Sequence, residues 1–183
     1  SVNETSEYIT RDLNAGRFDF FCGGITIPSR KIESVRLLKK GSNGIEFFTT
    51  QVLYDGKKIK KMLKYYDDVC KENNVLPRRI LLSFAPVSSK KNIDFLKWLG
   101  VEIPSQTEKR LTNKKTSMSD ESLEIASEIL KGILNNNEKL GITVPIGLNV
   151  EHIMSYNFQS SINMLQELSR IYREFCIKTS LYD

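Results

Sequence analysis

An uncharged amide and a carboxylate follow an apolar strand pattern in the first third of the chain. Residues 44–55 run from Gly44 through two phenylalanines and two threonines to Gln51 and Asp55, and a segment with helical periodicity follows. An amide donates and accepts hydrogen bonds at once. Because polar groups at the carboxyl ends of buried parallel strands usually meet a ligand, this position is a predicted binding site.

A second strand end of the same kind lies at residues 84–88, where an apolar run stops at Pro86. A short helical pattern follows, and the chain then reads Gly-Val-Glu-Ile-Pro at 100–104. Turn residues at both ends of short apolar runs are typical of strands that alternate with helices.

In order and spacing, these two segments resemble the methylenetetrahydrofolate reductase family. The resemblance extends from about Tyr8 to Leu168 and matches strands five to eight of the family's barrel. It implies an α/β fold in which parallel βα units form the C-terminal half of a TIM-type (βα)8 barrel, with residues 1–183 as a single domain. Residues 1–13 read as the tail of a helix that follows an earlier unit, so we expect a longer protein whose N-terminal half carries strands one to four.

The resemblance also assigns ligand-binding residues. Gln51 matches the glutamine that hydrogen-bonds the folate in the family, and Asn92 stands roughly where the family has a second glutamine. Lys40 matches a lysine near the phosphates of the flavin, and Glu33 matches an aspartate near the same cofactor. Two alternatives stay open: Gln51 as a strand-end amide that satisfies backbone groups, and Lys40 as a surface lysine.

The reaction implied by the resemblance is the flavin-dependent reduction of methylenetetrahydrofolate, or a related methylene-pterin, to the methyl form. The cofactor would be FAD, with FMN as a second option, and NAD(P)H would be the electron donor in one-carbon metabolism and methionine biosynthesis. The family's general acid lies on strand one and its flavin-tuning aspartate on strand four. We therefore assign no catalytic residue to this chain and expect it to be inactive alone.

Departures from the family pattern favour an alternative. The loop after the first strand is shortened to residues 28–31, and neither 149–152 nor 154–158 supplies the arginine that the family has at strand eight. The alternative is a non-catalytic or divergent barrel relative that acts as a pterin-binding or methyl-transfer partner subunit.

Alternating strand and helix patterns predict parallel βα units that position these side chains at one edge of a sheet. The predicted strands cover residues 18–27, 45–53, 80–85 and 142–150. An open flavodoxin-like sheet is the alternative architecture. A half barrel leaves two unpaired edges, so we expect pairing with the missing N-terminal half or oligomerisation.

The intervening helices are predicted from apolar residues at three- and four-residue steps. Residues 104–117 have no such period and predict a long mobile connection, with a lid as one option. Five helices are expected. The first runs from a cap at Ser29 to Gly41, the second covers the lysine-rich segment up to Asn73, and the third runs from a cap at Ser88 or Ser89 to Gly100. The fourth runs from 119–121 to the asparagines at 135–137, and the fifth covers 158–175.

Composition excludes several classes of function. The chain has 183 residues, of which 40% are hydrophobic, and this suits one domain with a sizeable core. Its net charge is +5. It lacks an apolar run long enough for a bilayer, so we expect no membrane contact and a cytoplasmic location. The basic run at 56–64 reads as the solvated face of a helix rather than a nucleic-acid site. The three cysteines read as reduced core thiols, and one histidine leaves little for a metal site.

Overall fold

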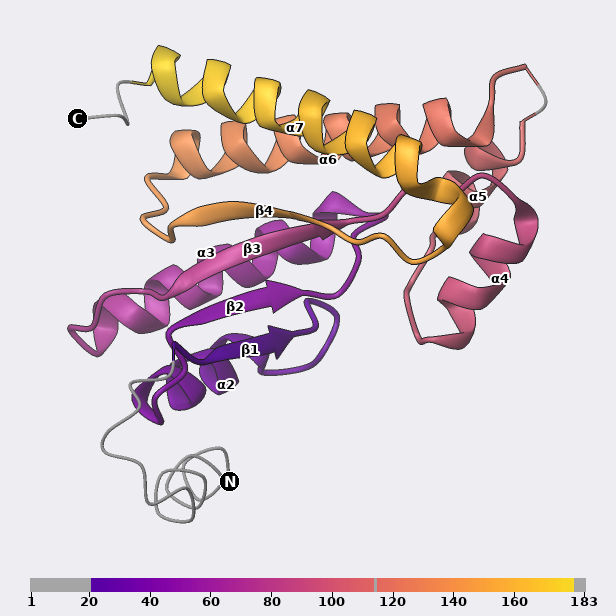
Figure 1. Cartoon of the computed structure of the whole chain (residues 1–183). Helices are drawn as coiled ribbons and strands as arrows, with labels where there is room; N and C mark the ends of the chain where they lie inside the picture. Colours follow the sequence, from indigo (N-terminus) through magenta and orange to yellow (C-terminus); the bar gives the residue numbers. More distant parts are fainter. Residues whose placement is uncertain (1–20, 114, 180–183) are drawn as a thin grey trace, which may run out of the picture.

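The structure of the protein, a computed structural model, describes residues 21–113 and 115–179. Four strands, β1 (Gly23–Thr26), β2 (Phe47–Thr50), β3 (Arg79–Phe84) and β4 (Ile146–Val150), pair in the order of the chain. Every pairing is parallel, which confirms the predicted sheet (Figure 1). A flavodoxin-like sheet would place its first two strands in reverse order, so the topology is that of half a TIM-type barrel.

Four long helices cover one face of this sheet. They are α2 (Glu33–Ser42), α3 (Gly56–Glu72), α6 (Met118–Leu140) and α7 (Phe158–Lys178), and each packs against the next along the layer. The shorter α4 (Lys90–Trp98) and α5 (Ser105–Leu111) lie beyond the carboxyl ends of the strands (Figure 1). A single 3-10 turn, η1 (Ser155–Asn157), precedes α7. None of the described helices is both long and apolar enough to cross a membrane.

Side chains alternate between the two faces of the sheet, as the period of a strand requires. Phe48, Leu82 and Phe84 are fully buried against the helices. Ile25, by contrast, is 69% exposed on the concave face, the face that lines the interior of a complete barrel. The concave face of the half barrel is therefore open. The helix side also buries Cys70 and Cys176, in line with the prediction of reduced core thiols, whereas Cys22, also a free thiol, is only half-buried against the same core.

The strands are shorter than the predicted runs, and residues 18–20 and 1–13 lie outside the described part of the chain. Ile45 precedes β2 and Val52 and Leu53 follow it, all of them buried without belonging to the ladder. Apolar character marks burial rather than strand pairing, so the run extends past both ends of the hydrogen-bonded segment.

Within residues 104–117, predicted as a mobile connection or lid, the structure contains the docked helix α5. Within this segment α5 buries Leu111, which is 1% exposed, in a second core beyond the strand ends. The guanidinium of Arg110 bonds Glu121 and Glu128 and so ties α5 to α6. The helical period was hidden because Leu111 is the only aliphatic side chain in the seven residues of α5.

The ends of two helices, α2 and α6, also differ from the prediction. Ser29 does not cap α2, which begins after Ile32 in a left-handed conformation with φ of 55° and ends at Ser42 rather than Gly41. The asparagines at 135–137 do not end α6, which continues to Leu140. Gly141 adopts the left-handed conformation (φ 58°) that closes a helix, and it provides the stronger stop signal.

The N-cap of α6 gives a first prediction. The side chain of Ser117 accepts a hydrogen bond from the backbone N–H of Asp120 at 3.1 Å. Ser117→Ala removes this acceptor and should lower the free energy of unfolding by about 1 kcal/mol. Urea unfolding measures the change, and Ser119→Ala in the same turn is the control. Equal effects of the two substitutions would show that the cap contributes nothing particular.

Both outer strands carry a helix side chain on their open edge. Successive carbonyls of a strand point to opposite sides, and those of Cys22 and Thr26 accept hydrogen bonds from the β2 segment. The carbonyl of Ile25 therefore faces the open edge of β1, where it accepts a hydrogen bond from Lys40 Nζ at 2.8 Å. On the far edge, the hydroxyl of Tyr172 donates to the carbonyl of Ile146 at 2.9 Å. A lysine side chain that occupies the open edge of a strand disfavours uncontrolled pairing there. Oligomerisation and pairing with an N-terminal half stay predictions.

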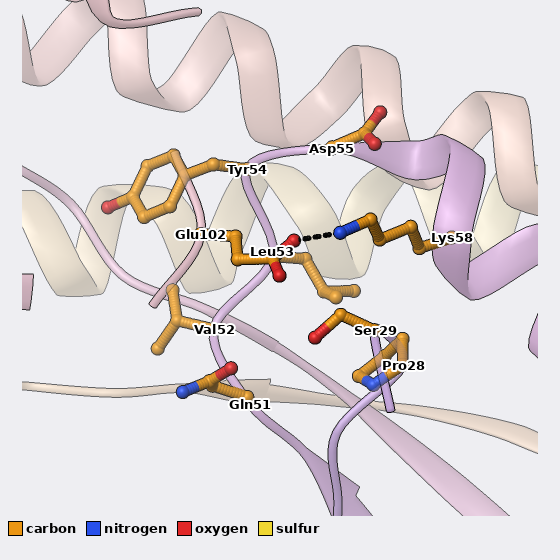
Figure 2. Close-up of a pocket in the computed structure, with 9 residues that line it drawn as sticks. All are labelled: Pro28, Ser29, Gln51, Val52, Leu53, Tyr54, Asp55, Lys58 and Glu102. Atoms are coloured by element: carbon orange, nitrogen blue, oxygen red, sulfur yellow. Dashed lines mark hydrogen bonds and ion pairs between the residues drawn. The ribbon is translucent and has the colours of Figure 1, made fainter. Parts of the chain in front are cut away.

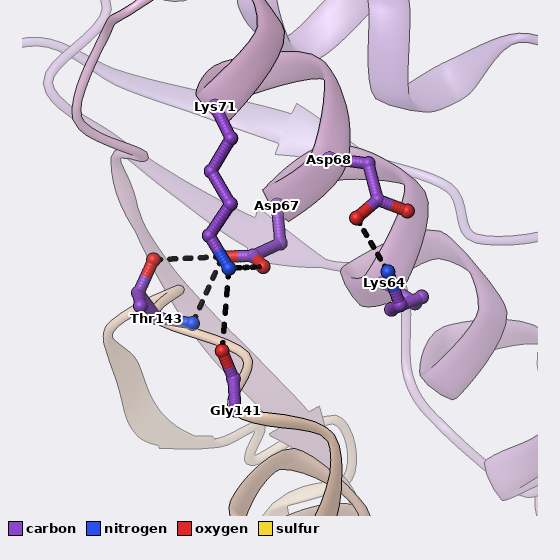
Figure 3. A network of polar contacts seen from close by, with 6 residues as sticks. All are labelled: Lys64, Asp67, Asp68, Lys71, Gly141 and Thr143. Atoms are coloured by element: carbon purple, nitrogen blue, oxygen red, sulfur yellow. Dashed lines mark hydrogen bonds and ion pairs between the residues drawn. The ribbon is translucent and has the colours of Figure 1, made fainter.

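A buried carboxylate joins α3 to the loop that enters β4 (Figure 3). Asp67 accepts from the backbone N–H of Thr143 at 2.8 Å and from its hydroxyl at 2.7 Å, and Lys71 Nζ lies 2.5 Å away. Burial alone would raise the pKa of Asp67, but the bonds from Lys71 and Thr143 outweigh it and hold the pKa below its usual value. This network fixes β4 at the edge of the sheet.

Candidate functional site

A pocket of about 290 Å³ opens at the carboxyl end of the concave face, and we call it the rim pocket. It lies at the strand ends, where ligands of parallel barrels bind. Its apolar walls come from β1 and from the end of α4, and two polar groups from different strand ends border it. Its lining includes Ile25, Gln51, Leu96, Val101 and Glu151.

Gln51 is the residue that the sequence singled out, and it follows β2 directly. Its backbone N–H donates to the carbonyl of Thr26 at 2.9 Å, which fixes the main chain. Within residues 21–113 and 115–179, its half-buried side-chain amide has no hydrogen-bond partner. In Figure 2, which shows a smaller hollow on the same rim, this amide points away from Ser29 and Lys58. A ligand in the rim pocket can therefore use both its donor and its acceptor.

Glu151 is the second polar group at the rim pocket. Asn149 Nδ2 donates to Ser83 Oγ at 3.0 Å and lies 3.5 Å from Glu151 Oε1. Burial raises the pKa of the Glu151 carboxyl above its ordinary value, and a hydrogen bond with Ser83 offsets part of this effect. A carboxylate in such a place gains from a ligand that donates hydrogen bonds to it.

The loops around the rim are tied to one another. Tyr54 donates its hydroxyl to the carbonyl of Ala85 at 2.8 Å, and burial, with the charge of Glu151 adding, raises the pKa of this phenol. Lys58 forms an ion pair with Glu102 across the smaller hollow (Figure 2), and that bond lowers the pKa of the Glu102 carboxyl. These contacts hold the strand-end loops in place around Gln51.

Asn92, the other residue assigned to substrate, lies at the start of α4. Its Oδ1 accepts from the backbone N–H of Ser88 at 3.0 Å and from Asn157 Nδ2 at 3.2 Å, and its Nδ2 donates to the hydroxyl of Tyr156. The side chain is 2% exposed. Its polar atoms therefore link α4 to the turn before α7, and a contact between Asn92 and substrate stays a prediction.

Glu33 and Lys40, the residues assigned to a flavin, lie together beside β1, and neither borders the rim pocket. Glu33 Oε1 accepts from the hydroxyl of Thr26 at 3.1 Å and from the N–H of Ile27 at 3.2 Å. Lys40 Nζ lies 3.9 Å from the same oxygen while it caps the edge of β1. A diphosphate next to this lysine would also meet the carboxylate of Glu33, which repels it. These contacts do not favour a flavin diphosphate, and binding of FAD or FMN here stays a prediction.

The sequence indicates Glu151 and His152 as residues near a strand end that could serve a different substrate tail or cofactor, or a helix cap, but it does not bring Glu151 to the same site as Gln51. Alternation along β4 puts Asn149 and Glu151 on the concave face, which is a signal that the sequence contains. This signal can be used only when the register of β4 with its neighbour β3 is known. In the structure Ser83 pairs with Asn149, and this register brings Glu151 to the carboxyl end of the sheet.

Comparison with known proteins supports this architecture. No family model matches the chain, and no curated protein matches it. Among solved structures, 57 chains match. One is an uncharacterized protein from Clostridium thermocellum that binds two copies of 5-methyl-5,6,7,8-tetrahydrofolic acid, with 26% sequence identity and a TM-score of 0.74. The alignment covers 90% of this chain and 57% of that protein, so this chain spans little more than half of its length.

Proposed function

We propose that this protein binds a reduced folate and that the rim pocket receives the pterin ring. The observation that carries the proposal is that two polar groups border one apolar pocket at the strand ends: the Gln51 amide, which has no side-chain partner among the described residues, and the Glu151 carboxyl. The likeness to a protein that binds 5-methyltetrahydrofolate supports the same ligand class. An apolar pocket with a few convergent polar groups is the usual form of a small-molecule site.

The chemistry of the pterin suits this pocket. Its pyrimidine edge presents a ring N–H and an amino group side by side, next to a carbonyl. A carboxylate accepts from both donors, and an amide donates to the carbonyl or accepts from a ring nitrogen. Ile25, Leu96 and Val101 offer apolar surface for the faces of the ring. The one-carbon group on the reduced ring would then lie within the concave face.

The raised pKa of Glu151 makes a prediction about both stability and binding. The unfolded carboxyl ionises near 4.5, whereas the folded one ionises only at higher pH, so its charge opposes folding at pH 7 and no longer does so below 4.5. Glu151→Gln should therefore raise the melting temperature at pH 7, leave it unchanged at pH 4, and weaken folate binding at pH 7. Thermal scans and titrations measure these effects, with the exposed Glu124→Gln as control. A lower melting temperature at pH 7 would contradict this account.

A flavin-dependent reductase of methylenetetrahydrofolate is the second candidate, favoured by the resemblance of residues 44–55 and 100–104 to that family. When bound, a flavin would supply the hydride transfer with NAD(P)H as donor. Residues of this chain would then contribute only the folate contacts, since the resemblance places the acid on strand one.

Colour and turnover separate the two candidates. A protein that only binds folate is colourless, whereas a bound oxidised flavin absorbs near about 450 nm. We expect the purified 183-residue chain to be colourless and unable to reduce methylenetetrahydrofolate with NAD(P)H. Measurable reduction by this chain would establish the reductase and refute the assignment of the acid to another segment.

A further inference from the structure

A second cavity lies between α2 and α3, on the helix side of the sheet. It has a volume of about 440 Å³, and we call it the helix groove. It shares no lining residue with the rim pocket. Its volume falls within the range of pockets for small organic ligands.

The helix groove is bordered by a carboxylate with an unused oxygen. Glu33 is 2% exposed, and its Oε1 holds the start of the loop after β1. Its Oε2 is buried and has no hydrogen-bond partner within the described residues. A buried acceptor without a donor costs free energy, so a ligand that brings an N–H group gains from reaching it. Met62 also borders the groove and accepts a hydrogen bond from the Thr26 hydroxyl at 3.4 Å, and its flexible side chain would have to shift to admit such a group.

Apolar side chains stand exposed beside this carboxylate. Tyr65 on α3 is 65% exposed, and Ile32 and Val35 at the start of α2 are 67% and 51% exposed. All three border the helix groove. An aromatic ring with one free face offers a stacking surface for a planar ligand.

Basic side chains also line the helix groove. Arg30 and Lys61 border it, and within the described part of the chain neither belongs to an ion pair. Lys58 also borders it but is paired with Glu102. A ligand with carboxylates at one end and N–H donors at the other would match these unpaired cations and the oxygen of Glu33 together.

We propose that the helix groove is a second site for a pteroylglutamate. The pterin donates from its ring N–H and amino group to Glu33 Oε2, the aminobenzoyl ring packs on Tyr65, and the glutamate carboxylates pair with Arg30 and Lys61. The choice of a folate as ligand rests on the proposed function. The groove itself is separate from the rim pocket, so each site has its own test.

The test is the stoichiometry of 5-methyltetrahydrofolate binding to the full chain, measured by equilibrium dialysis and calorimetry. We expect two molecules per chain. Tyr65→Ala should weaken one site by about tenfold or more through lost stacking. Lys61→Ser should weaken the same site and reduce its dependence on salt. Both side chains are exposed, so folding should be preserved, and the exposed Lys139→Ser is the matched control.

The outcomes distinguish the two proposals. One folate per chain that is lost in Gln51→Leu but unchanged in Tyr65→Ala and Lys61→Ser would overturn the helix groove and leave the proposed function standing. One folate that depends on Tyr65 and Lys61 but not on Gln51 would support the groove and overturn the rim pocket. If the chain binds no 5-methyltetrahydrofolate, both proposals are wrong.

Discussion

Gln51→Leu should lower the affinity of the rim pocket for 5-methyltetrahydrofolate by about one to two orders of magnitude. The amide has no partner in the described structure, so leucine breaks no internal bond of its side chain. In the complex, however, leucine leaves a polar edge of the pterin unpaired in an apolar pocket, at a cost of about 1 to 3 kcal/mol. Folding should be preserved, because the strand is held by the backbone bond to Thr26.

Calorimetric titration at fixed salt and pH measures the loss at Gln51. Gln106→Leu on α5 is the matched control, because that glutamine is exposed and borders none of the pockets described above. If Gln51→Leu binds like the parent while its melting temperature drops, Gln51 is a structural residue and the rim-pocket assignment is wrong.

The largest effect on stability is expected at Asp67. The side chain is 1% exposed and satisfies two donors of Thr143 as well as the ammonium of Lys71. Asp67→Ala leaves the backbone N–H of Thr143 without its acceptor and should cost about 3 kcal/mol. For a chain of this length, that corresponds to a fall of about 6 to 12 °C in melting temperature.

The neighbouring Asp68→Ala provides the control for Asp67. Asp68 pairs with Lys64 on the surface of the same helix (Figure 3), and exposed pairs contribute about 0.5 kcal/mol. If both substitutions cost the same, the link from α3 to β4 does not depend on the buried carboxylate.

The dependence on pH gives a second check on Asp67. Because its folded pKa lies below the usual 3.8, its contribution is full above the unfolded pKa and is lost as the pH falls through the folded value. Asp67→Ala should therefore differ most from the parent near neutral pH, and the difference should shrink in acid. A difference that grows in acid would contradict the direction of the shift.

The strands and their direction could be predicted because apolar runs separated by helical patterns leave few topologies. The stop of α4 was visible in Gly100, which adopts a φ of 82°, and its start in the cap at Ser89. Local signals of this kind depend on a few adjacent residues. They fail where two signals compete, as in α6, where the asparagines at 135–137 suggested an end and Gly141 provides it.

The rest depended on contacts between distant segments. The docking of α5 rests on Leu111 and on ion pairs to α6, and one apolar side chain in a short polar segment predicts neither. Likewise, local sequence does not predict that Glu33 Oε2, at the start of α2, is buried without a hydrogen-bond partner among the described residues. Gln51 was found because its position after a strand is a local feature, whereas its neighbour Glu151 required the register of β3 with β4.

A crystal structure of the protein grown with 5-methyltetrahydrofolate tests the central claim most directly. The account predicts a pterin ring in the rim pocket, with the Gln51 amide and the Glu151 carboxyl each within about 3 Å of a polar atom of the ring. Ile25, Leu96 and Val101 should contact its faces. A rim pocket that stays empty at a concentration of folate that saturates the protein in solution, whether or not a pterin is bound in the helix groove, would contradict it.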